Sequence, residues 1–522
     1  MNQTYCLRFL TILILILLSL GYAHTKMISG TVFEDVNSNL ILDDDEKGIQ
    51  GVLISNQFDV VKTDEKGKYT IPVQERSIIF IIKPRGYNVP VDKNYSPKFY
   101  YIHDPNGSPN FRYQGVKPTG RLPEKVDFPL YQSEPRDTFK IIVFADPQTR
   151  NEKELDYMRD DIITELVNTD ASGGIVLGDI MFDDLSFFDK YKQLIGQIGI
   201  PFYQVPGNHD MNYDALDDQY ALETFKHHFG PTYYAFQYGK VHFIVLDDVE
   251  YQGSQEQIKY IGKIGTQQLK WIENYLQHVP EEHLIVLNMH IPLYTFIDEN
   301  PSINVTDRKA LFSLLSTRQH LLVLAGHMHM IEHQFLTTEV DWHGQQPLHQ
   351  ITCGTVSGTW WSGPPDIRGI PIADQRDGVP NGYHIFEFSG NRFTERYKSA
   401  QMDDDYQIRI SWPVGKIHRS ELDSLKIVAN VFNGNEKSEV TCLLDNQKPI
   451  TLTREIMIEP YFEAIYSQFT ELYASWVNPQ LSNHLWTGSL PFELPGGLHK
   501  ITIYTTNKYG VKYKTTTIFE LE

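Results

Sequence analysis

The residues of this chain that could do chemistry lie in five short motifs, each directly after an apolar run. Together they offer carboxylate, amide and imidazole groups, which are ligands of divalent transition metals in proteins. Two such ions held about 3.5–4 Å apart turn a shared water into hydroxide near neutral pH and take up charge from phosphoryl oxygens. The motifs therefore predict hydrolysis of a phosphate ester at a pair of metal ions. They are Asp146-Pro-Gln148, Gly178-Asp179, Gly207-Asn208-His209-Asp210, Asn288-Met-His290 and Gly326-His327-Met-His329.

No single motif carries this interpretation. Gly178-Asp179 alone is a common turn, the segment from Gly207 to Asp210 fits an Asx turn, and His290 alone could be a core histidine. The last motif is more informative, because its two histidines point the same way on an extended chain. Five such motifs in this order are hard to obtain by chance.

The elements that must position these motifs read as an α/β domain. Runs rich in Ile, Val and Leu indicate strands buried on both faces, and they alternate with apolar residues at helical spacing, such as Leu155, Met158, Ile162 and Leu166. Ligands of layered α/β domains bind beyond the carboxyl ends of the strands. We therefore expect the motifs to converge at one edge. The runs are 140–145, 175–177, 202–205, 241–246, 284–287 and 321–325.

In residue type and order, the five motifs resemble those of the calcineurin-like metallophosphoesterase superfamily, over residues 139–388. The resemblance implies an α/β fold, a four-layer α/β/β/α sandwich. The flanking segments look like the extra N- and C-terminal domains of a bacterial branch, the latter mainly at 484–491 and 497–499. The loop at 353–363 also resembles that branch, and either forms a wall of the site or packs as an edge loop.

The resemblance also implies a role for each motif residue. Asp179 would bridge the two ions. His209 would protonate the departing oxygen or steady the phosphoryl charge, and Asp210 would orient the His209 ring through its other nitrogen. The remaining ligands would be Asp146, Gln148 and His329 for the first ion, and Asn208, His290 and His327 for the second.

One departure from the family pattern concerns the first ion. The family usually has Asp-x-His in the first motif, where this chain has Asp146-Pro-Gln148. An amide oxygen in place of an imidazole favours a harder ion. We therefore expect two divalent transition-metal ions with manganese favoured over iron or zinc, and direct attack by a metal-bridging hydroxide without a covalent enzyme intermediate.

Two further segments read as β-sandwich domains around the central one. We expect domains at 26–131, 138–399 and 400–522, because short alternating strands separated by turns dominate both flanks. In the last domain, Asn433-Gly434 predicts a hairpin turn, and 494–510 has the rhythm of a final hairpin. The two cysteines that follow the leader, Cys353 and Cys442, are expected to be free thiols.

The first of these domains contains an acidic loop with the spacing of a calcium site. Positions 1, 3, 5, 9 and 12 of the loop offer oxygen ligands, but position 6 is Leu40 instead of the usual glycine. The alternatives are a structural calcium ion and an acidic turn between two strands. The candidate ligands are Asp35, Asn37, Asn39, Asp43 and Glu46.

Charge and the first residues restrict partners and location. A net charge of -20 over 522 residues disfavours nucleic acid as a partner, so we expect a small phosphate ester. Residues 1–23 read as a signal peptide, with an apolar run at 9–20 that is too short to span a bilayer. We expect export to a periplasm or the cell surface and no membrane span after cleavage; an uncleaved anchor is the alternative.

The competing hypothesis is a secreted binding or adhesion protein whose central domain is a degenerate scaffold. Gln148, the acidic loop and the β-rich flanks motivate it. Metal content and turnover separate the two hypotheses. The sequence leaves open which ester is the substrate and the oligomeric state.

Overall fold

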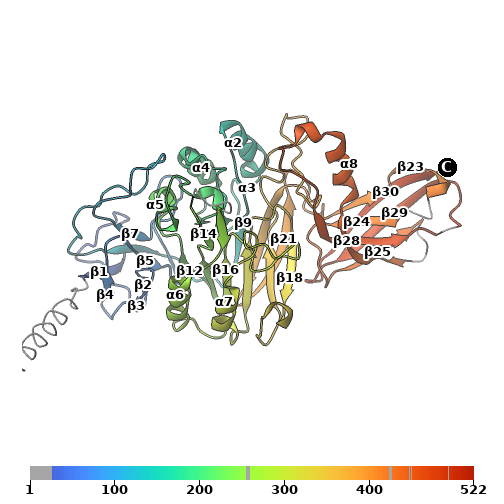
Figure 1. Cartoon of the computed structure of the whole chain (residues 1–522). Helices are drawn as coiled ribbons and strands as arrows, with labels where there is room; N and C mark the ends of the chain where they lie inside the picture. The colour runs from blue at the N-terminus through green and yellow to red at the C-terminus, as the bar shows by residue number, and fades with distance from the viewer. Residues whose placement is uncertain (1–25, 254–258, 422–425, 446, 448, 492) are drawn as a thin grey trace, which may run out of the picture.

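The computed structural model describes residues 26–253, 259–421, 426–445, 447, 449–491 and 493–522. The predicted signal peptide at 1–23 lies outside the described residues. Within them, no helix has both the length and the apolar character needed to cross a membrane. The chain forms a row of three regions, with the amino-terminal strands at one end and the carboxyl-terminal strands at the other (Figure 1).

Two sheets form the centre of the molecule. The first has the strand order β11-β10-β9-β20-β21 and the second β12-β13-β16-β17-β19-β18. Their inner faces pack together through aromatic side chains: the Tyr203 and Phe236 rings stack at 3.7 Å between centroids. The strands are β9 (Thr138–Phe144), β10 (Gly173–Leu177), β11 (Phe202–Val205), β12 (Tyr234–Tyr238), β13 (Val241–Val245), β16 (Leu284–Asn288), β17 (Leu321–Ala325), β18 (Glu332–Leu336), β19 (Leu348–Thr352), β20 (Gly382–Ser389) and β21 (Arg392–Ser399).

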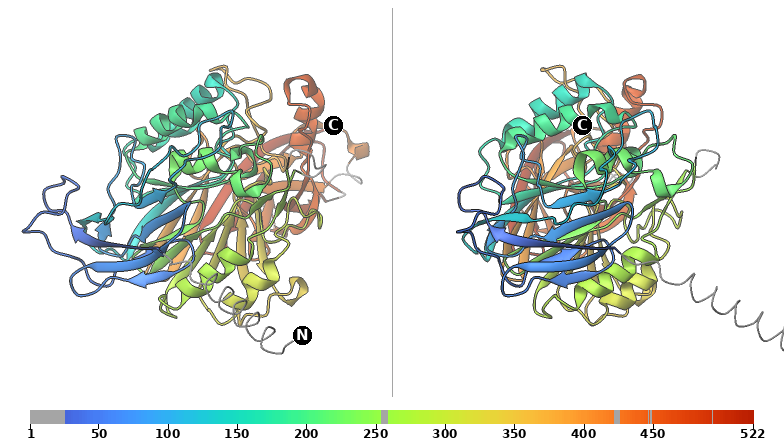
Figure 2. Two further views of the ribbon diagram at one scale, coloured as in Figure 1. Left: turned by 60° about the vertical axis from the view of Figure 1, so that its left-hand side comes forward. Right: turned by 90° about the vertical axis from the view of Figure 1, so that its left-hand side faces the viewer.

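Helices cover both outer faces of this pair of sheets. One side carries α2 (Glu152–Met158), the π-helix η1 (Arg159–Ile163), α3 (Thr164–Leu166) and α4 (Phe188–Ile195); the other carries α6 (Thr266–Leu276) and α7 (Arg308–Leu315) (Figure 2). Leu155, Met158, Ile162 and Leu166 are all buried. The predicted four-layer α/β/β/α sandwich is confirmed.

The amino-terminal region consists of two four-stranded sheets that pack against the central domain. Their orders are β4-β1-β8-β6 and β3-β2-β5-β7. The buried indole of Trp271 in α6 donates to Ser55 Oγ of β2 at 3.0 Å, so the region shares a core with the centre. The strands are β1 (Lys26–Glu34), β2 (Leu53–Ser55), β3 (Val60–Lys62), β4 (Lys68–Val73), β5 (Ser77–Ile82), β6 (Tyr87–Asn88), β7 (Tyr100–His103) and β8 (Phe128–Gln132).

The acidic loop between β1 and β2 closes on itself. The amides of Asn37 and Asn39 each donate to Asp43 Oδ2 at 2.8 Å, and Glu46 accepts the backbone N–H groups of Val36 and Asp43. Leu40 takes a φ of 64°, the conformation for which glycine is preferred at this position. These contacts bring the candidate ligands together, and calcium binding remains a prediction.

The carboxyl-terminal region has its own core between sheets ordered β22-β24-β28-β27 and β23-β30-β29-β25-β26. The expected hairpin at Asn433-Gly434 is wrong, because β24 and β25 belong to different sheets. The expected free thiols Cys353 and Cys442 are confirmed, and both are buried. The elements are β22 (Ile408–Trp412), β23 (Gly415–Ile417), β24 (Lys426–Val431), β25 (Glu439–Leu444), β26 (Ile450–Thr451), β27 (Thr453–Ile458), α8 (Pro460–Gln468), β28 (Leu481–Ser489), β29 (Gly497–Thr506) and β30 (Lys512–Leu521).

Candidate metal centre

All five motifs lie at the carboxyl ends of central strands. In the first sheet they follow β9, β10 and β11, and in the second sheet they follow β16 and β17. These strands run parallel within each sheet, with Val176 opposite Phe144 and Asn288 opposite Leu324. The ends therefore meet at one edge, as the sequence predicts.

The backbone bends sharply where the candidate ligands begin. Five of them adopt a positive φ, which is uncommon for residues with a side chain and costs about 1–3 kcal/mol each. Such strain persists only where the surrounding structure enforces it, and it concentrates at functional sites. The residues are Asp146 (45°), Gln148 (43°), Asp179 (49°), His327 (72°) and His329 (52°).

Close approach explains two glycines of the motifs. A Cβ at Gly207 would lie 2.3 Å from Asp179 Oδ1, and one at Gly326 would lie 2.6 Å from Asp146 Oδ2. Both distances are far below van der Waals contact, so a side chain at either position would displace a candidate metal ligand.

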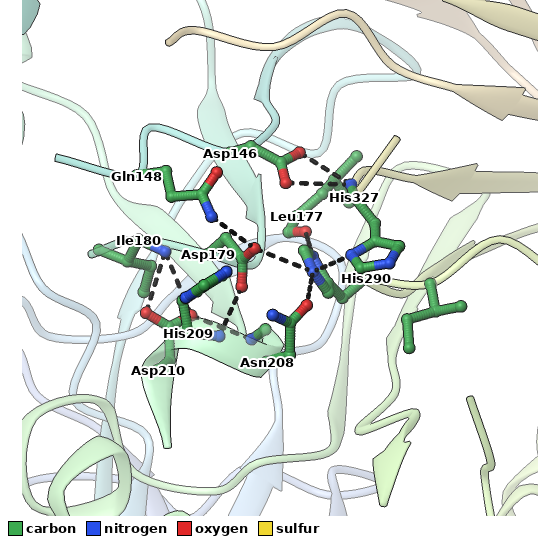
Figure 3. Close-up of polar contacts among 12 residues, drawn as sticks. Asp146, Gln148, Leu177, Asp179, Ile180, Asn208, His209, Asp210, His290 and His327 are labelled. Atoms are coloured by element: carbon green, nitrogen blue, oxygen red, sulfur yellow. Dashed lines mark hydrogen bonds and ion pairs between the residues drawn. The ribbon is translucent and has the colours of Figure 1, made fainter. Parts of the chain in front are cut away.

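The candidate ligands form two groups around Asp179, and Figure 3 labels all of them except His329. In the first group, Gln148 Oε1 lies 2.7 Å from His329 Nε2, which lies 3.7 Å from Asp146 Oδ1. In the second group, His290 Nε2 lies 3.0 Å from Asn208 Oδ1 and 3.1 Å from His327 Nδ1. This division is the one that the resemblance implies.

Asp179 contacts both groups with one carboxylate oxygen. Its Oδ2 accepts a hydrogen bond from Gln148 Nε2 at 3.1 Å and lies 3.3 Å from His290 Nε2. Ligand atoms of Asp179, His290 and His327 all lie within 4.8 Å of one another. Asp179 is therefore placed to bridge two ions.

The spacing of these atoms matches ligands of a metal ion. Bonds of about 2.0–2.2 Å from a metal to nitrogen or oxygen separate neighbouring ligand atoms by about 3.0–3.4 Å. The contacts of His290 Nε2 with Asn208, His327 and Asp179 span 3.0–3.3 Å. These residues fit a divalent cation at the point where their donor atoms converge.

The three candidate ligand histidines are each fixed through their second ring nitrogen. His290 Nδ1–H donates to Leu177 O at 2.8 Å, and His329 Nδ1–H donates to Gly358 O at 2.6 Å. His327 is reversed: Nε2–H donates to Ser302 O at 3.1 Å, and Nδ1 faces the cluster. Backbone carbonyls hold metal-ligating histidines in this way in proteins.

Burial and neighbouring charges set the protonation of the cluster. Burial lowers the pKa of His327 and of His329 to about 3, so both rings are neutral, as metal ligands must be. Burial also disfavours charge on His290, but Asp179 and Asp146 raise the pKa of His290 to about 10, so a bound cation would have to displace the proton of this ring. Burial raises the pKa of Asp146 to about 8. Burial alone would also raise the pKa of Asp179. The charges of His290 and His209 outweigh burial and hold the pKa of Asp179 below its usual range. A divalent cation would offset the charge of both carboxylates.

His209 lies beside the bridging residue, but its orienting partner differs from the prediction. Its backbone N–H donates to Asp179 Oδ1 at 2.8 Å, and its Nδ1–H donates to Asp183 Oδ1 at 2.6 Å. Asp210 therefore does not hold the ring, and that prediction is wrong. The short 3₁₀ helix η4 (Asn208–Asp210) turns the Asp210 carboxylate toward the backbone N–H groups of Ile180, Met181 and Gly207.

A cavity of about 360 Å³ opens over the ligand cluster. Besides five of the candidate ligands, it is lined by His209, Tyr260, Ile297, Asp298, Asn300, Ile303, Met328, Trp360, Arg376 and Gln480. The Trp360 ring stacks on His329 at 3.8 Å, so part of the glycine-rich loop at 353–363 forms a wall of the cavity. Sequence reasoning missed Arg376 and Gln480, because they lie in irregular segments that match no motif.

An aromatic stack connects this cavity with the carboxyl-terminal region. Phe182 stacks on His209 at 4.5 Å, and Trp476 stacks on Phe182 at 5.4 Å. Trp476 also meets Trp360 edge-on at 6.3 Å. The exposed indole of Trp476 thus touches both rings that pack on site histidines.

Comparison with protein families gives three matches along the chain. Residues 139–330 match the family described as Calcineurin-like phosphoesterase. Residues 37–116 match the family described as N terminal of Calcineurin-like phosphoesterase, and residues 351–513 match its C terminal counterpart.

Curated relatives are distant. The chain is 25% identical over 170 residues to the protein named Probable glycerophosphodiester phosphodiesterase GpdQ of Arcobacter nitrofigilis, covering 31% of this chain and 58% of that protein. It is 26% identical over 182 residues to the 3',5'-cyclic adenosine monophosphate phosphodiesterase CpdA of Escherichia coli K12, covering 33% and 58%. The match thus spans 58% of the length of each relative.

Among solved structures, the chain is similar to a dimetal phosphatase from Danio rerio. The identity is 16%, the TM-score is 0.36, and the match covers 50% of this chain and 96% of that one.

Proposed function

Since the chain belongs to the calcineurin-like phosphoesterase family, we propose that it is a metal-dependent phosphoric ester hydrolase acting on a small phosphomonoester or phosphodiester. One observation carries the proposal. Three buried or half-buried histidines, each fixed by a backbone carbonyl, aim their remaining nitrogens at ligand atoms around Asp179. Two bound divalent cations would supply hydroxide near neutral pH and offset charge on the phosphoryl oxygens.

The chain's own residues divide the remaining work. Asp179 holds the two ligand groups together, and His209 faces the cavity from beside it. Asp183 accepts the Nδ1–H of His209 and fixes the ring. Burial disfavours a charged ring, but the Asp179 and Asp183 carboxylates raise the pKa of His209 above its usual value. The ring can therefore carry protons on both nitrogens and give the one on Nε2 to the departing ester oxygen.

Two finer features belong to the proposal. The amide oxygen of Gln148 supports manganese in the first position.

The apolar run at residues 9–20, preceded by Arg8 and followed by Gly21 and Ala23, supports export to a periplasm or the cell surface. Amino-terminal sequencing of the protein from cell fractions tests export: a mature chain beginning at His24 supports it, and an intact cytoplasmic chain contradicts it.

The test of function is turnover by the purified protein with defined metals. The two curated relatives described above are named as phosphodiesterases, so a chromogenic phosphodiester is the first substrate to assay, followed by a monoester. We expect manganese-dependent turnover that a chelator abolishes. Absence of turnover with manganese, iron and zinc would favour the degenerate scaffold instead.

A further inference from the structure

Arg376 stands out in the cavity over the metal centre. It is the single lysine or arginine among the described residues that line this cavity. The protein carries a net charge of -20, so an anionic ester gains little from the rest of the surface. A cation in the cavity wall is therefore well placed to attract such a substrate.

Among the described residues, the Arg376 guanidinium forms no ion pair, although the charge of the adjacent Asp377 favours its charged form. Its Nη2 donates to Asn478 Oδ1 at 3.0 Å, and its Nε donates to Asn478 O at 3.4 Å. Burial lowers the pKa of Arg376 to about 10, which leaves the side chain charged at neutral pH. A half-buried charge that meets only neutral acceptors retains the capacity to bind an anion.

The carboxyl-terminal region holds Arg376 in place. Besides the Asn478 contacts, the Gln480 N–H donates to Arg376 O at 2.9 Å. On the other side, the Arg376 N–H donates to the carbonyl of His329, a candidate metal ligand, at 3.1 Å. The neighbouring Asp377 accepts a hydrogen bond from His484 Nε2 at 2.9 Å. Arg376 is thus tied both to the metal centre and to the third domain.

We propose that Arg376 is a substrate-binding residue that pairs with an anionic phosphoryl oxygen of the bound ester. Asn478 is a positioning residue, through which the carboxyl-terminal domain completes the active site. The inference rests on the proposed function, and it assigns to the third domain a role that the five motifs do not contain. Planar guanidinium groups recognise phosphate with two parallel hydrogen bonds, so lysine would replace Arg376 only in part.

The test uses inorganic phosphate as the probe and the manganese-loaded full chain as the protein. Calorimetry measures phosphate affinity, steady-state kinetics measure KM and kcat, and mass spectrometry measures manganese content. We expect Arg376→Met to weaken phosphate binding by about tenfold to a hundredfold with manganese content unchanged. Arg376→Lys should recover part of the loss. Asn478→Ala should raise KM more than it lowers kcat, because it displaces a binding group and leaves the metal centre intact.

Arg392→Met is the matched control, because it removes the same charge at the end of the first sheet that lies away from the metal centre. Arg392 is exposed. In the strand register it lies opposite Ser389, which lies opposite Thr138 at the amino end of β9. It should bind phosphate like the unaltered protein.

Two outcomes are distinguishable. Unchanged phosphate affinity in Arg376→Met overturns the inference alone. If Arg376→Met does not fold, unchanged phosphate affinity and KM in both Arg376→Lys and Asn478→Ala overturn it equally. An unaltered protein that binds neither manganese nor phosphate overturns the proposed function, and the inference with it.

Discussion

The two ligand groups on either side of Asp179 are built from the same kind of strand end but differ in chemistry. The group of Asp146, Gln148 and His329 offers two oxygens and one nitrogen, whereas the group of Asn208, His290 and His327 offers one oxygen and two nitrogens. Carboxylate and amide oxygens are preferred ligands of manganese, whereas imidazole nitrogens are preferred ligands of zinc and iron. On the proposed function, the first group would favour manganese and the second would also accept zinc or iron.

The largest change should come from the residue that the two groups share. Asp179→Asn removes the charge that attracts both cations, although it keeps the size of the side chain. We expect loss of both ions and of turnover, measured by metal analysis and by ester hydrolysis. An Asp179→Asn protein that retains two ions would show that this carboxylate does not bridge them.

Separate changes in the two groups should remove the ions one at a time. His329→Ala should lose the first ion and His327→Ala the second, because each ring supplies a nitrogen to one group only. Metal content should fall from about two ions per chain to about one in each variant. If either variant loses both ions, the two groups are not independent, and the comparison fails.

A change beside the cluster should spare both ions. His209→Ala should lower turnover by about 10²–10⁴-fold with two ions retained, because His209 contacts Asp179 through its backbone N–H. Asp183→Asn should lower it less, by about 10–100-fold, since the ring stays but loses its charged partner. His209→Ala that loses metal would instead make His209 a ligand.

The smallest change should alter the metal preference of the first group, and that group should still bind an ion. Gln148→His replaces an amide oxygen with an imidazole nitrogen and makes the two groups more alike. We expect the ratio of zinc to manganese affinity to rise, measured by competitive metal binding. An unchanged ratio would place Gln148 outside the coordination sphere.

The sequence predicted the centre of this molecule well because its signals are local. Each ligand motif follows an apolar strand, and parallel strands bring their carboxyl ends to one edge of a sheet. The four-layer arrangement follows from the same alternation of strands and helices. The left-handed backbone conformation of Gln148 and His329 could not be predicted from local sequence, because it depends on the surrounding packing.

What the sequence could not predict depends on the path of the chain between motifs. The Asp210 carboxylate accepts hydrogen bonds from backbone N–H groups, and Asp183 instead of Asp210 orients the His209 ring. Both acids lie close to motif residues in the sequence, so spacing alone does not tell which of them contacts His209. Arg376 reaches the cavity through contacts with Asn478, about a hundred residues away. Likewise, Asn433-Gly434 has the residues of a hairpin turn, but the strands around it join different sheets.

The most direct test of the account is a crystal structure of the manganese-loaded protein with anomalous data at the manganese edge. The account predicts two anomalous peaks that share Asp179, one beside Gln148 and His329 and the other beside Asn208 and His327. A single peak, or none within bonding distance of Asp179, would contradict it.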